Sequence, residues 1–218
     1  MYNVVLDLEM CKVPVLYRNK DYKYALETIQ IGAVLLDENF RQVDTFERYV
    51  HPEHGVIDNF IKNLTGIVSK NVKDAQPLEV VLREMADWIG DKEYRIYAWS
   101  ENDFMQLYRE LRCKSIHDDK IDKIMYPERW RDYQAVFGER YGYKNCVSLE
   151  DALDLCDIDA IGRMHDGLDD AVNTAALVSK LELNPNYELI RQKYVVEESE
   201  PIGTCLGDIF ACFQLQSA

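Results

Sequence analysis

The chain has 218 residues, of which 47% are hydrophobic and 11% aromatic, and its formal net charge is −14. This length and composition suit one compact α/β domain and exclude a disordered chain, while the longest apolar run, residues 31–36, is too short to span a membrane. The acidity argues against broad nucleic-acid binding, which needs a basic surface. It does not argue against a protein that binds only the short end of a nucleic acid, or one whose carboxylates bind cations.

The first half of the chain predicts three consecutive strands, because β-branched and aliphatic residues are concentrated there. They cover residues 4–9, 28–36 and 43–50. An insertion over residues 13–24 separates the first two. Two helices follow, one over residues 59–65 that is closed by Gly66, and one over residues 78–89 that ends at Gly90.

Strands and helices alternate in the second half. Strands are expected over residues 94–99 and 130–133, the second running into a helix. Further helices are expected over about residues 103–111, from Ser148 onward, and over residues 168–181. Three consecutive strands followed by this alternation predict an α/β fold with a mixed sheet that helices cover.

The character of the chain changes after Pro185. Residues 187–196 predict a short helix, and residues 202–215 are apolar and punctuated by glycine. Such a segment is too apolar to stand free in water, so we expect it to pack on the domain, on a second copy or on a partner protein. The predicted division is a domain over residues 1–183 and a C-terminal extension over residues 184–218.

The six cysteines are scattered, with no Cys-x-x-Cys pair and no nearby histidine partner. Neither a zinc site nor a disulfide framework is therefore expected. The N-terminus shows no basic segment or cleavage site of a secretory signal. We expect a cytoplasmic protein with reduced cysteines and no membrane contact.

Two carboxylates lie at the end of the first predicted strand. Asp7 and Glu9 are two residues apart, and side chains at positions i and i+2 of a strand project from the same face. Both acids therefore converge on one spot, where their repulsion favours hard cations between them. An isolated Asp-x-Glu is also typical of a solvated strand end, so this pair alone does not decide the function.

Two later segments place acids at predicted helix starts. Asp103 follows the fourth strand, where an ordinary helix N-cap is the alternative interpretation. Near the last helix, His165 lies on a loop before Gly167, and Asp170 lies in the acidic first turn. Asp169 competes with Asp170 as the functional acid, and a loop histidine is also a common surface or capping residue.

Taken in order, these residues resemble the DEDD exonuclease superfamily, histidine (DEDDh) branch. That branch is marked by His-x-x-x-x-Asp in its last motif, whereas the sister branch carries tyrosine where this chain has Asp166. The resemblance covers residues 2–181 and implies an RNase H-like fold with a five-stranded mixed sheet, antiparallel in its first three strands. Its residues here are Asp7, Glu9, Asp103, His165 and Asp170.

Within that branch, the chain is most similar to the Eri-like 3′ exoribonuclease subgroup, as a bacterial-type member. Four segments carry this likeness: residues 27–34, 64–67, 99–103 and 165–170. The resemblance implies a metal-dependent 3′→5′ exonuclease that acts on the 3′ end of single-stranded nucleic acid, RNA rather than DNA, and releases nucleoside 5′-monophosphates. Met10 and Cys11 stand where many members carry a threonine.

The resemblance also implies a chemistry for the acids. Two divalent cations, Mg²⁺ or Mn²⁺, lie about 4 Å apart in such sites, and oxygen ligands select these ions over zinc. Asp7 would bridge both ions, Glu9 and Asp170 would complete the first, and Asp103 would hold the second through water. His165 would be the general base.

The family contacts the terminal nucleotide beside the first motif and around the Leu-Thr-Gly-Ile segment, with core packing as the alternative for each residue. These contacts would come from Leu8, Met10, Cys11, Leu64, Trp99 and His165, with Phe104 as another stacking surface. The insertion interleaves basic and tyrosine residues, a composition typical of a single-strand binding surface or, alternatively, of a solvated loop. Its members are Lys12, Tyr17, Arg18, Lys20, Tyr22, Lys23 and Tyr24.

Three other functions stay open from the sequence. A DNA exonuclease of the proofreading type would use the same active site. A regulatory interaction protein on this fold would be expected to lose ligand carboxylates, and all four are present. An endonuclease of the ribonuclease H type would lack the histidine before the last aspartate.

Overall fold

The computed structural model describes residues 1–18 and 25–190. These residues form one mixed sheet of five strands and the helices around it. The strand order is β3-β2-β1-β4-β5, with β1 antiparallel to β2 and parallel to β4. This is the predicted RNase H-like α/β sheet. The strands are β1 (Tyr2–Lys12), β2 (Leu26–Leu36), β3 (Gln42–Tyr49), β4 (Tyr94–Ala98) and β5 (Trp130–Asp132).

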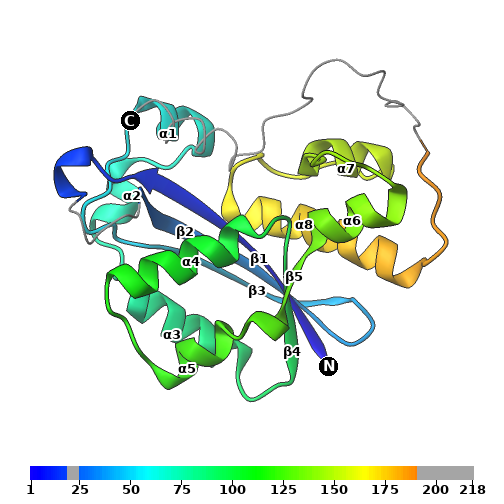
Figure 1. The fold of residues 1–218 in the computed structure, drawn as a ribbon, viewed down its shortest axis with the longest axis horizontal. Coiled ribbons are helices and arrows are strands. Elements are labelled where there is room, and N and C mark those ends of the chain that lie inside the picture. The colour runs from blue at the N-terminus through cyan, green and yellow to red at the C-terminus, as the bar shows by residue number, and fades with distance from the viewer. Residues whose placement is uncertain (19–24, 191–218) are drawn as a thin grey trace.

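Helices cover both faces of the sheet (Figure 1). On one face lie α3 (Leu78–Ile89), α4 (Asn102–Cys113) and α5 (Asp119–Ile124). On the other lie α6 (Tyr133–Tyr141), α7 (Leu149–Leu155) and α8 (Gly167–Leu183). The short elements are α1 (Asn59–Thr65), α2 (Ser69–Lys73), and the 3₁₀ turns η1 (Val15–Tyr17) and η2 (Pro127–Arg129).

The central strand β1 is buried on both faces, which explains its nearly continuous apolar sequence. Val4, Leu6 and Leu8 pack in the core beneath α3 and α4. Val5 belongs to the opposite core, under α8. Asp7 and Glu9 continue the alternation of Val5, so the two acids point to the α8 side, as their spacing predicted.

The predicted strands and the longer helices are confirmed, with α1 and α3 ending at the expected glycines. Gly66 adopts the left-handed conformation (φ 77°) that closes a helix at low cost. The helices α2 and α5 were not predicted, because five and six residues are too short to show a helical period.

The helix predicted over residues 187–196 is wrong for its described part, because residues 187–190 are not helical. Groups of these residues instead form hydrogen bonds with residues at the end of α7. The Tyr187 hydroxyl donates to the Cys156 carbonyl (2.8 Å), and the Ile190 N–H donates to the Leu155 carbonyl (3.1 Å). Residues 191–218, which include the predicted apolar tail, lie outside the described residues.

Neither a disulfide nor a membrane span is found within residues 1–18 and 25–190. The cysteines at positions 11, 113, 146 and 156 are free thiols. No helix within residues 1–18 and 25–190 has the length and apolarity needed to cross a bilayer.

Two glycines allow helix α8 to begin directly against strand β2. A Cβ atom on Gly32 would lie 2.1 Å from the carbonyl carbon and oxygen of Gly167. The Gly167 N–H donates to the Gln30 side-chain oxygen (3.0 Å), which secures the same junction. The start of α8, with its acids, is thereby held close to the sheet.

We expect Gly32→Ala to lower the free energy of unfolding by about 1–3 kcal/mol, because the methyl group would have to displace backbone rather than a flexible side chain. Urea denaturation measures this. Gly138→Ala is the control, since its nearest contact is 3.6 Å away and alanine favours the interior of a helix by about 0.5–1 kcal/mol. Equal effects of the two substitutions would contradict the close β2–α8 contact.

Candidate active site

Strand β1 and helix α4 bring three acids together. Glu9 is almost fully buried and Asp7 is partly buried, next to an irregularity in the β1–β2 pairing between Glu9 and Met10. Asp103, in the first turn of α4, accepts a hydrogen bond from the Leu8 N–H (3.1 Å). Because Leu8 lies between the two β1 acids, this bond places the third carboxylate beside them. The N-cap of α4 is Glu101, so the alternative role of Asp103 as N-cap does not apply.

The start of α8 supplies the fourth acid. Asp166 is the N-cap and accepts the N–H groups of Leu168 (3.1 Å) and Asp169 (3.2 Å). Asp170 accepts the N–H of His165 (2.8 Å). His165 adopts the left-handed backbone conformation (φ 64°), which is strained for a residue with a side chain and is maintained by this bond.

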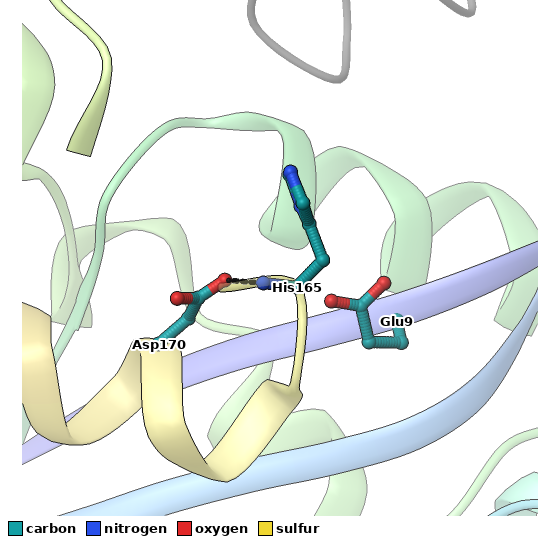
Figure 2. Close-up of side chains that lie close together, drawn as sticks. All are labelled: Glu9, His165 and Asp170. Carbon is teal, nitrogen blue, oxygen red and sulfur yellow. Dashed lines mark hydrogen bonds between the residues drawn. The ribbon is translucent and has the colours of Figure 1, made fainter. Parts of the chain in front are cut away.

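The two neighbouring aspartates, Asp169 and Asp170, face different partners. Asp169 accepts the N–H of Arg163 (2.7 Å), so its carboxylate faces the preceding loop. Asp170 instead joins Glu9 and His165, and one potential ligand atom of each lies within 4.8 Å of the others. Figure 2 shows the carboxylates of Glu9 and Asp170 on either side of the His165 backbone, with the imidazole extending away from β1.

Two oxygen atoms in this cluster are buried without a hydrogen-bond partner among the described residues. They are Oε2 of Glu9 and Oδ1 of Asp170. A buried carboxylate oxygen without a donor costs free energy, so its presence indicates a missing positive group. Hard divalent cations prefer oxygen ligands of this kind, and the residues present therefore fit a metal site.

The electrostatics of the four acids support the same conclusion. Burial raises the pKa of Asp7 and Glu9 well above the ordinary value, and the neighbouring acids raise both further. Burial likewise raises the pKa of Asp103 and of Asp170 to about 7. The hydrogen bonds that the Leu8 N–H donates to Asp103 and the His165 N–H donates to Asp170 lower these pKa values, but by less than burial raises them. Their charges can be borne together at neutral pH only if cations compensate them.

Arg163 is a residue of this site that the sequence did not indicate. Its guanidinium donates to the carbonyls of Asn63 (2.7 Å) and Leu64 (3.1 Å) and covers Gly66 at the end of α1. It also lowers the pKa of Glu9, against the larger effect of burial. The loop that bears His165 is thereby tied to α1, a contact between segments 99 residues apart that no local pattern reveals.

The structure places most of the predicted nucleotide contacts in the core. Leu8 and Met10 pack beneath α3 and α4, and Cys11 packs with Ile29 and Ile61. Trp99 is buried and donates its ring N–H to the Val147 carbonyl (3.2 Å), which gives it a packing role. Leu64 and Phe104 are partly exposed. The substrate contacts themselves stay predictions.

Comparison with known proteins shows matches along most of the chain. Residues 4–178 match the family model RNase_T, described as Exonuclease. Human "ERI1 exoribonuclease 2" is 29% identical over 83% of this chain and 28% of its own length. Human "3'-5' exoribonuclease 1" is 26% identical over 73% of this chain and 47% of its own length. The chain therefore spans less than half of either relative.

A solved structure agrees with the fold. It is described as the nuclease domain of 3′hExo, a DEDDh family member, bound to rAMP. It is 26% identical, with a TM-score of 0.69, and the match covers 86% of this chain and 94% of that one. The similarity thus extends over nearly the whole of that nuclease domain.

We expect the metal-free protein to lose stability as the pH rises from about 4 to about 7. Asp103 and Asp170 have folded-state pKa values of about 7 against 3.8 normally, so in this range the folded protein binds more protons than the unfolded chain. The free energy of unfolding then falls with pH, and added Mg²⁺ or Mn²⁺ should restore it. Melting temperatures measured across pH, with chelator or with cation, test this.

Asp170→Asn is the matched variant, because its amide oxygen can still accept the His165 N–H. It should melt with a weaker pH dependence and a smaller increase on adding cation. A pH-independent melting temperature in the unsubstituted protein would contradict the electrostatic description of the site.

Proposed function

This chain belongs to the RNase_T exonuclease family, and from that membership we propose that it is a metal-dependent 3′→5′ exonuclease. It removes nucleotides one at a time from the 3′ end of single-stranded nucleic acid, with RNA preferred over DNA. The observation that carries the proposal is the convergence of Glu9, His165 and Asp170, with ligand atoms within 4.8 Å of one another.

Four carboxylates would hold the metal: Asp7, Glu9, Asp103 and Asp170. We propose two divalent cations, Mg²⁺ or Mn²⁺, because the acids offer oxygen ligands and the described residues around them supply no thiolate. When bound, such cations neutralise the charge that develops on the phosphate and its leaving oxygen and lower the pKa of water. The partnerless oxygens of Glu9 and Asp170 support this assignment.

His165 is the proposed general base. Burial lowers the pKa of its imidazole, and the nearby Arg163 lowers it further, so the ring is neutral near pH 7 and can accept a proton. It takes that proton from the water whose oxygen bonds to phosphorus. The bond from phosphorus to the 3′ oxygen of the preceding nucleotide breaks, that oxygen takes up a proton from solvent to become the new 3′ hydroxyl, and a nucleoside 5′-monophosphate is released.

The preference for RNA rests on the relatives. Both human relatives are named as exoribonucleases, and the matching nuclease domain was solved with rAMP, a ribonucleotide. A proofreading DNA exonuclease would share the carboxylates, so activity on RNA and on DNA distinguishes the two enzymes. The division at residue 183, a dimer or partner contact through the tail and a cytoplasmic location stay predictions from the sequence.

Digestion of 5′-labelled RNA and DNA oligonucleotides with Mg²⁺ or Mn²⁺ tests the activity. We expect a ladder that shortens from the 3′ end, faster on RNA. Asp7→Asn should abolish it, because the amide keeps the size of the side chain but loses the charge that holds the cations. Internal cuts would favour an endonuclease, and no cleavage with either cation would favour an interaction protein.

His165→Ala tests the base separately from the metal. We expect kcat to fall by about 10²–10⁴-fold near neutral pH, the usual contribution of general acid–base catalysis. Binding of Mn²⁺, followed by calorimetry, should persist because the four carboxylates remain. Unchanged turnover would remove His165 as the base without affecting the metal assignment.

A further inference from the structure

Beyond the end of the active-site strand, three aromatic side chains and one lysine, each at least partly exposed, form a surface that the proposed chemistry does not use. It consists of Lys12, Tyr17, His54 and Phe60, which we call the ring surface. We propose that the ring surface binds the single-stranded nucleic acid upstream of the terminal nucleotide, by stacking on its bases. This inference rests on the proposed function and names a second substrate subsite for it.

Tyr17 and Phe60 are exposed, and the rings of Tyr17 and His54 are stacked in parallel. Tyr17 is 50% exposed and stacks on His54, with centroids 5.0 Å apart and planes within 5° of each other. Phe60 is 41% exposed and lies 5.5 Å from the Lys12 ammonium. Every base offers a flat face on which an exposed aromatic ring can stack.

The position of the ring surface connects it to the active site along two elements. Lys12 follows Glu9 on β1 by three residues, about 10 Å at the rise of a strand. Phe60 precedes Leu64 by one turn of α1, and the Leu64 carbonyl binds Arg163 of the His165 loop. In Figure 1, η1, which carries Tyr17, is the blue turn beyond the arrowhead of β1.

The backbone holds these segments together. The Val56 N–H donates to the Lys12 carbonyl (2.9 Å), which pairs the segment of His54 with the end of β1. The buried carboxylate of Glu27 accepts the N–H of His54 (2.8 Å). The Arg18 side chain donates to the Val13 carbonyl (2.8 Å) and closes the η1 turn. The backbone segments that carry Lys12, Tyr17 and His54 are therefore held in place by hydrogen bonds.

Charge distinguishes a nucleic acid from other occupants. The chain carries a net charge of −14, yet residues 10–18 contain Lys12 and Arg18 and no acid. Residues 56–73, which include α1 and α2, carry three lysines and a single acid, Asp58. Glu53, 3.6 Å from the His54 ring, and Asp74, directly after α2, are acids at its edges. A local basic region with rings, beside a site for a phosphate polymer, fits a single strand.

Binding of a labelled single-stranded RNA of about 12 nucleotides, a length typical of stacking sites, tests the proposal. Fluorescence anisotropy in chelator avoids cleavage. Tyr17→Ala with Phe60→Ala should raise Kd about tenfold or more, since each stacked base contributes about 1–3 kcal/mol. Tyr17→Phe with Phe60→Tyr keeps the rings and should retain the original Kd. Tyr126→Ala, at another 50% exposed ring, is the distal control.

Kinetics distinguish this subsite from the catalytic site. With Mg²⁺, the alanine pair should raise KM for the long oligonucleotide by the same factor and leave kcat and all constants for a dinucleotide unchanged. Equal changes in KM for both substrates, or no change in either, would overturn the proposal that the ring surface binds the upstream strand. So would a concentration-dependent oligomer that the alanine pair abolishes while Kd stays constant. Inactivity of the unsubstituted protein on both substrates would overturn the proposed function alone, because the anisotropy measurement needs no turnover.

Discussion

Mutual repulsion among buried carboxylates is the constraint around which this structure is organised. Asp7, Glu9, Asp103 and Asp170 come from three elements, and each has a raised pKa because burial and neighbouring acids disfavour its charge. Such an arrangement is unfavourable for folding and exists only because the surrounding contacts over-determine it. The Leu8 N–H positions one acid, and the glycine contact between β2 and α8 positions another.

A second buried charge cluster shows by contrast what the site lacks. Lys114 lies 3.0 Å from Glu27 and 2.8 Å from Glu110, and Glu110 also accepts the backbone and hydroxyl groups of Thr28. Although burial opposes it, the pKa of Glu27 is below its ordinary value because Lys114 and the His54 N–H stabilise its charge. Both buried acids of this cluster thus have Lys114 as a cationic partner, although burial still raises the pKa of Glu110. Among the described residues, no lysine or arginine forms an ion pair with Asp7, Glu9, Asp103 or Asp170, which agrees with a site that binds metal cations.

The proposed base and the proposed metal ligand are mechanically linked. Asp170 uses one oxygen to hold the His165 backbone in a strained conformation and leaves the other without a partner. Arg163, two residues before the histidine, ties the same loop to the end of α1. A displacement of α8 would thus move the acid and the imidazole together. One helix start therefore sets the geometry of both groups.

The sequence by itself determined the elements and the order of the acids. Apolar alternation, helical periodicity and terminal glycines are local properties, so β1, α1 and α3 could be predicted, as could the shared face of Asp7 and Glu9. Only the tertiary structure decided which partner each side chain takes. Asp103 binds an N–H 95 positions away, Asp170 rather than Asp169 turns to Glu9, and residues 187–190 bond to α7 instead of forming a helix. The physical reason is that hydrogen bonds and charge interactions depend on distances in space, which local periodicity does not contain.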